Sequence, residues 1–89
     1  MEQRNRPVEM LSVCSPDGML RPVRFRYEGE DHAVRTVQIS EIVCKNEISY
    51  VGIEAIIYVC KAQIEELERL FELKYTVQTH RWVLFQVIY

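Results

Sequence analysis

Alternation of apolar and charged residues with a period of two is the feature that most restricts the fold of this chain. In residues 23–27, Val23, Phe25 and Tyr27 alternate with Arg24 and Arg26. The same period returns in residues 71–77. Successive side chains of a β-strand point to opposite faces, so this pattern predicts strands with one buried face. We therefore expect a mostly β protein.

The chain has 89 residues, of which 48% are hydrophobic and 27% charged, as expected for one small globular domain. We predict a flexible N-terminal segment at residues 1–7 and a single β-rich domain at residues 8–89. The expected strands cover residues 8–14, 23–27, 33–39 with a continuation at 42–44, 53–61, 71–77 and 81–89. Ser15-Pro-Asp-Gly18 is typical of a tight turn, and residues 45–52 are expected to form a loop.

The segment between the last two long strands has a different period. Ile64, Leu67 and Leu70 are spaced as on one face of a helix, and the residues around them are good helix formers. We predict a short helical segment near residues 62–70, within a small barrel of about six short antiparallel strands of the SH3-like or OB-like type. The alternative is an α+β sheet with a genuine helix over residues 62–71.

Two predicted strands are apolar on both faces. Residues 53–61 are therefore expected to lie centrally in the sheet. Residues 81–89 would invite pairing with another chain if they formed an edge, so we expect them to be inserted centrally, to close the barrel or to lie in a subunit interface. Insertion is favoured. The candidate interface side chains are Ile64, Leu67, Trp82, Phe85, Val87 and Tyr89.

Charge is unevenly distributed along the chain. Its net value is −2, which excludes a polycation, but residues 1–26 carry +2, residues 27–72 carry −6 and residues 73–89 carry +2. If the first and last strands are neighbours, the two basic segments form one face. The candidate anion or nucleic-acid contacts are Arg21, Arg24, Arg26, Arg35, Lys74 and Arg81. Tyr27, Tyr75 and Trp82 are the obvious rings for stacking, although the alternation favours the core for both tyrosines.

The spacing of cysteines and histidines gives no local metal site. Cys14, Cys44 and Cys60 lie far apart, and no Cys-x-x-Cys or His-x-x-x-His pair occurs. Cys44 and Cys60 are expected to be core thiols. Three glycines are too few for a phosphate-binding loop, and no nucleophile motif surrounds any serine or cysteine. We expect no enzymatic activity, no cofactor and no metal.

The expected location is the cytoplasm. An odd number of cysteines is typical of a reducing compartment. The longest apolar run, residues 55–60, is too short to span a membrane, and Glu9 interrupts the only stretch that resembles a signal sequence. No membrane partner is expected.

Two motifs carry a resemblance. Pro22, Phe25 and Tyr27 fit the pattern P-x-x-F-x-[Y/W]. A later stretch fits [Y/F]-E-L-x-Y-x-x-x-x-x-x-W-x-L through Phe71, Glu72, Leu73, Tyr75, Trp82 and Leu84. From Asp17 to its end, the chain resembles a family of small uncharacterised bacterial proteins, a domain of unknown function. The resemblance implies a unit of this size and no activity. Residues 64–70 depart from it, since they look longer and more helical than the family's turn.

These observations lead to two hypotheses about function. The first is a non-catalytic interaction module that self-associates, as in a homodimer, or binds a protein partner through an apolar strand or patch. The second is a nucleic-acid-binding small barrel that uses the arginine-rich strand face.

Overall fold

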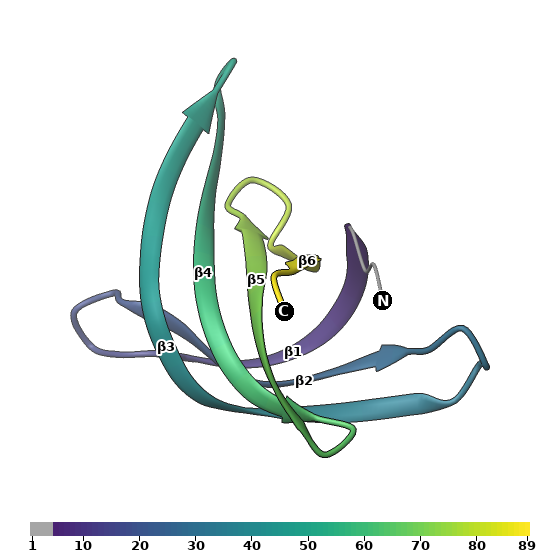
Figure 1. The fold of residues 1–89 in the computed structure, drawn as a ribbon. Coiled ribbons are helices and arrows are strands. Elements are labelled where there is room, and N and C mark those ends of the chain that lie inside the picture. The colour runs from purple at the N-terminus through teal and green to yellow at the C-terminus, as the bar shows by residue number, and fades with distance from the viewer. Residues whose placement is uncertain (1–4) are drawn as a thin grey trace.

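The computed structural model describes residues 5–89, and their regular structure consists of six β-strands. These are β1 (Arg6–Cys14), β2 (Leu20–Glu28), β3 (Val34–Tyr50), β4 (Ile53–Ile64), β5 (Leu67–Thr76) and β6 (Arg81–Val87). Each strand pairs antiparallel with the next, and β6 pairs with β1, so the sheet closes into a barrel (Figure 1). The predicted mostly β barrel is confirmed. Its strands follow the order of the sequence, whereas an OB-fold is a Greek-key barrel, and the SH3-like or OB-like type is not confirmed.

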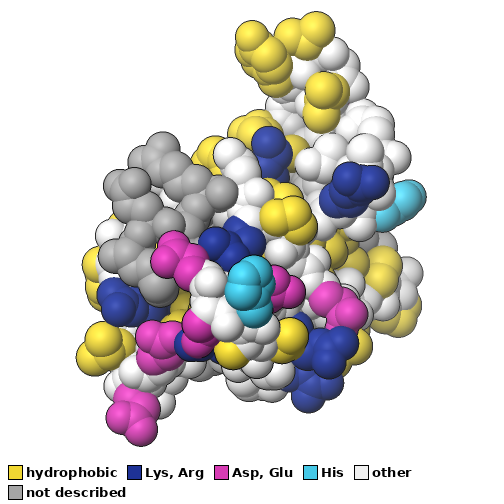
Figure 2. Space-filling view, turned by 90° about the vertical axis from the view of Figure 1, so that its right-hand side faces the viewer, with side chains coloured by type: hydrophobic (Ala, Val, Ile, Leu, Met, Phe, Trp, Pro, Cys, Tyr) yellow, Lys and Arg dark blue, Asp and Glu magenta, His cyan; other side chains and the backbone are white. Residues whose placement is uncertain are grey.

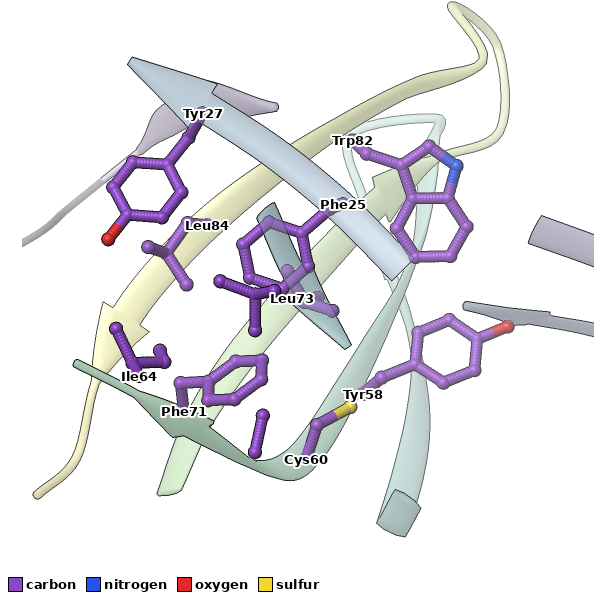
Figure 3. Packing of buried hydrophobic residues seen from close by; sticks show 11 residues of the cluster. Phe25, Tyr27, Tyr58, Cys60, Ile64, Phe71, Leu73, Trp82 and Leu84 are labelled. Carbon is purple, nitrogen blue, oxygen red and sulfur yellow. The ribbon is translucent and has the colours of Figure 1, made fainter. Parts of the chain in front are cut away.

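The inward faces of the strands form one aromatic and aliphatic core. Phe25 and Phe71 meet edge to face with ring centroids 5.7 Å apart, and Tyr58 lies 5.5 Å from Trp82 (Figure 3). The alternation in residues 23–27 and 71–77 therefore reflects real burial. The buried cluster comprises Phe25, Tyr27, Val37, Tyr58, Cys60, Ala62, Ile64, Phe71, Leu73, Trp82 and Leu84.

The turn predicted at Ser15-Pro-Asp-Gly18 is present. The Gly18 N–H donates to the Ser15 carbonyl at 2.8 Å, and Gly18 has a φ of +88°. The Asp17 carboxylate accepts hydrogen bonds from the Ser15 hydroxyl and the Met19 N–H, and these bonds lower the pKa of Asp17. Local sequence was enough here because Pro, Asp and Gly each fit one position of a tight turn.

The helical segment predicted near residues 62–70 is wrong. β4 continues to Ile64, β5 begins at Leu67, and these two residues pair across a two-residue turn. Glu65 and Glu66 form that turn with φ angles of 53° and 69°, as a type I′ hairpin turn requires. Glutamate is a poor signal for such a turn, and pairing with β4 overrides the helix propensity of the segment. The α+β alternative falls with it, because residues 5–89 contain no helix.

The loop predicted at residues 45–52 is also wrong. β3 runs on to Tyr50, and only Val51 and Gly52 form a turn, again with positive φ angles of 51° and 79°. The ends of β3 and β4 project beyond the barrel as a two-stranded arm, which we define as residues 46–54, because β4 pairs with β5 from Ala55 onwards (Figure 1). β3 is a single strand despite two register shifts, near Ser40 and Val43, which bend it.

The first and last strands meet at the closure of the barrel. β1 begins at Arg6, two residues before the predicted start, and residues 1–4 of the predicted flexible segment lie outside the described residues. β6 ends at Val87 and lies between β5 and β1. The first and last strands are therefore neighbours, joined by three residue pairs from Arg6↔Leu84 to Val8↔Trp82.

Replacing Glu66 by glycine should stabilise the protein. A left-handed backbone costs a residue with a Cβ more than it costs glycine, so Glu66→Gly should raise the free energy of unfolding by about 0.5–1 kcal/mol. Glu68→Gly is the matched control, because it removes the same exposed side chain from within β5 and should destabilise. Urea denaturation of the three proteins measures both effects. A loss of stability in Glu66→Gly would contradict the turn assignment.

Candidate functional site

The tip of the arm exposes a group of large hydrophobic side chains. Tyr50 is 77% exposed and Val51 is 83% exposed, while Ile48 and Ile53 are each about half exposed. Figure 2 shows hydrophobic side chains gathered at the end of this projection. Isolated exposed apolar residues are common on proteins, but a group held away from the body of the molecule is typical of an interaction site.

The pairing of β3 with β4 places three of these side chains on one face of the arm. Tyr50 lies opposite Ile53, and Ile48 lies opposite Ala55. Paired residues of an antiparallel ladder project from the same face, so Ile48, Tyr50 and Ile53 form a continuous apolar strip. The polar residues Glu47, Ser49 and Glu54 occupy the other face.

The turn between β5 and β6 holds the arm in place. The Gln78 side-chain amide accepts a hydrogen bond from Glu54 N–H at 3.0 Å and donates one to the Gly52 carbonyl at 3.0 Å. The Val77 N–H donates to the Glu54 carbonyl at 2.9 Å. Gln78 thus continues the edge of β4 where β5 has ended, and the arm is supported almost to its tip.

A surface groove of about 590 Å³ lies beside the seam between β1 and β6. It is lined by Pro7, Val8, Met10, Ser12, Leu20, Tyr75, His80, Arg81, Trp82 and Val83. In its wall, the Tyr75 hydroxyl lies 2.8 Å from His80 Nδ1, and the Tyr75 and Trp82 rings have centroids 4.9 Å apart. The other histidine, His32, contacts Glu28 at 2.9 Å on the exposed turn between β2 and β3.

The predicted basic residues differ in their surroundings. Arg26 binds Glu9, and Arg35 binds both Asp31 and Glu65, in each case at the surface. Hydrogen bonds from the Arg35 guanidinium and from Ala33 N–H lower the pKa of Asp31. Of the remaining four residues, Arg21 and Arg24 are exposed on β2. Lys74 of β5 lies over the ring of Phe85, and Arg81 lines the groove. Two predicted stacking rings, Tyr27 and Trp82, are buried.

The predicted interface residues differ in exposure. Ile64 and Trp82 are buried in the core, Phe85 and Val87 are half-buried, and only Leu67 and Tyr89 are exposed. Sequence reasoning missed the arm tip, whose four apolar residues fall within the stretch predicted to be a loop or at its border. The signal present there was the apolar content of residues 48–53. This apolar content gave no indication that β3 and β4 extend beyond the barrel.

The three cysteines are free, and they differ in exposure. Cys60 is fully buried, whereas Cys14 and Cys44 are exposed. The prediction of a core thiol is confirmed for Cys60 and wrong for Cys44, because Cys44 lies just after a register shift on the outer face of β3. Within residues 5–89 no group of three or more His, Cys, Asp or Glu residues is arranged to hold a metal ion. The same residues contain no helix long and apolar enough to cross a membrane.

Comparisons with protein-family models, with curated proteins and with solved structures find no match to this chain. Its function is therefore inferred from its own residues and their arrangement.

Thiol reactivity should separate the cysteines. A thiol reagent should modify Cys14 and Cys44 in the folded protein and reach Cys60 only after unfolding, because Cys60 is fully buried. Mass spectrometry of labelled peptides, with and without denaturant, measures this directly. Rapid labelling of Cys60 in the folded protein would contradict its place in the core.

Alkaline pH should weaken the fold through the same residue. Burial, with a smaller contribution from Cys44, raises the pKa of Cys60 from 9.0 to about 12. Above pH 9 the unfolded thiol loses its proton while the folded one keeps it, so the free energy of unfolding should fall as the pH rises from 9 towards 12. Cys60→Ala should fall less steeply over this range than wild type, with Cys14→Ala as the control. Equal slopes in all three proteins would refute the assignment.

Proposed function

We propose that this protein is a non-catalytic interaction module that binds a protein surface through the apolar tip of its arm. The observation that carries the proposal is the exposure of Tyr50 and Val51 at the end of the arm, which Gln78 holds through a hydrogen bond, with Ile48 and Ile53 beside them. Full burial of an apolar side chain of this size contributes about 1.5–3 kcal/mol, so burying this group against a partner gives a substantial driving force.

The support of the arm strengthens the proposal. A flexible tip loses conformational entropy on binding, whereas a tip already held in one conformation loses little. The hydrogen bonds of Gln78 to Glu54 and Gly52 hold the arm before any partner arrives. An aromatic residue within a small apolar group, surrounded by polar residues, also has the composition of an interaction hot spot.

Charge near the tip favours a protein over an anionic ligand. Glu47 and Glu54 lie on the arm, and Lys45 at its base is the nearest basic residue of either strand. Carboxylates repel phosphate groups, so the arm is unsuited to nucleic acid or acidic lipid. The alternative function in nucleic-acid binding has less support, because Arg26 and Arg35 are engaged in ion pairs. The proposed location is the cytoplasm, supported by three free cysteines.

Photo-crosslinking tests the proposal in the native cell. A photoreactive phenylalanine analogue in place of Tyr50 should give a discrete crosslinked species containing this chain and a bound protein, either a second copy or another chain. The same analogue in place of Glu30, in the turn between β2 and β3, is the control and should give none. Adding Ile53→Ser to the Tyr50 probe should weaken the crosslink.

Mass spectrometry of the crosslinked species identifies what the tip contacts. Equal crosslinking from Glu30, or none from Tyr50, would overturn the proposed function.

A further inference from the structure

One edge of β3 lacks a strand partner along the arm. β3 pairs with β2 only from Val34 to Gln38, while its other edge pairs with β4 up to Tyr50. Beyond Gln38, no residue within 5–89 pairs with the edge that faces away from β4. Register shifts interrupt β3 at residues 39–41 and 42–44, but its pairing is regular from Cys44 to Tyr50. This last stretch is a regular strand with one unpaired edge.

Such an edge is a ready template for another strand. Its free N–H and C=O groups are aligned for pairing, and proteins usually protect an edge with bulges, prolines or a covering element. Here the register shifts protect only residues 39–44 of the edge, and residues 44–50 contain no proline. Ile48 and Tyr50 project from the outer face of the same stretch and are exposed. The edge and the apolar tip are therefore parts of one surface.

Two charged residues of this edge have no ion-pair partner in the described part of the chain. Lys45 and Glu47 lie opposite Tyr58 and Ile56 of β4, so both project from the face that continues the core side of the sheet. Neither takes part in any of the four salt bridges found among residues 5–89. The one polar contact of the Lys45 ammonium is with the Met19 sulfur, at 3.6 Å.

A second copy of the same edge supplies the missing partners. In an antiparallel pair related by a twofold axis through Asn46, Lys45 of each copy lies opposite Glu47 of the other. Opposite residues share a face and lie within reach of each other, so two ion pairs form at once. On the outer face, Ile48 of each copy lies opposite Cys44 of the other. An axis through Glu47 or Lys45 would instead place like charges opposite each other, which is unfavourable.

We propose that two copies of this chain associate through their β3 edges, antiparallel and with Asn46 at the twofold axis, to form one sheet continuous across both arms. This inference rests on the proposed function, because it names a second copy as the surface that the arm binds. The charges select the register, the backbone provides the pairing, and the apolar strip of each arm is partly covered by the other copy.

Charge reversal tests the register. Lys45→Glu and Glu47→Lys should each weaken self-association about tenfold, because each variant places like charges opposite each other twice. A mixture of the two single variants should associate as a heterodimer, and the double variant should regain self-association. Glu41→Lys changes the net charge as Glu47→Lys does, but lies outside the regular stretch, and should leave association unchanged. Light scattering over a wide concentration range measures the mass of each sample.

Disulfide trapping tests the axis. In a background with Cys14→Ser and Cys44→Ser, Asn46→Cys places two thiols directly opposite each other, at a Cα separation that a disulfide spans. Ser49→Cys is the control, because in this register its two copies lie about 20 Å apart, six residue steps at the rise of a strand. A covalent dimer from Asn46→Cys alone supports the inference. Trapping from Ser49→Cys alone, or equally from both, overturns it.

The two proposals fail separately. A monomer at every concentration, or charge variants that associate like the wild type, overturns the pairing of β3 edges. If the Tyr50 probe still crosslinks to a different protein in the cell, the proposed function stands while the self-association falls. If neither self-association nor any crosslink from Tyr50 is found, both are wrong.

Discussion

Closure of this barrel depends on a short seam. β1 and β6 share three residue pairs, from Arg6↔Leu84 to Val8↔Trp82, and one further hydrogen bond joins Asn5 N–H to the Phe85 carbonyl. A sheet with one aromatic face must cover that face, and six strands of this length cover it by closing on themselves. The seam therefore keeps Trp82 and its neighbours inside.

Unequal strand lengths account for the surfaces that remain open. β3 has 17 residues and β4 has 12, whereas β6 has only 7. Because the short strand β6 closes the barrel, the ends of the longer strands β3 and β4 extend past the closed wall and form the arm. β2 parts from β3 after Gln38, which leaves the edge of β3 uncovered. The apolar tip and the open edge thus have one geometric origin.

The parts of the fold that sequence predicted are those with local causes. The period of two in residues 23–27 reports a strand wherever it occurs, and Ser15-Pro-Asp-Gly18 supplies its own turn chemistry. The errors arose where pairing between strands decides the structure. Glu65 and Glu66 favour helix until β4 holds them in a left-handed turn. The exposed tip was not predictable from residues 48–53, because it depends on how far two strands outrun four others.

The hydrogen bonds of Gln78 join the arm to the turn between β5 and β6. The side chain binds the arm at Glu54 and Gly52, and its own turn leads within four residues to Trp82, whose ring centroid lies 4.9 Å from that of Tyr75. The indole is therefore connected to the arm through a few residues of one turn. Since the chain contains a single tryptophan, its fluorescence reports on this end of the barrel alone.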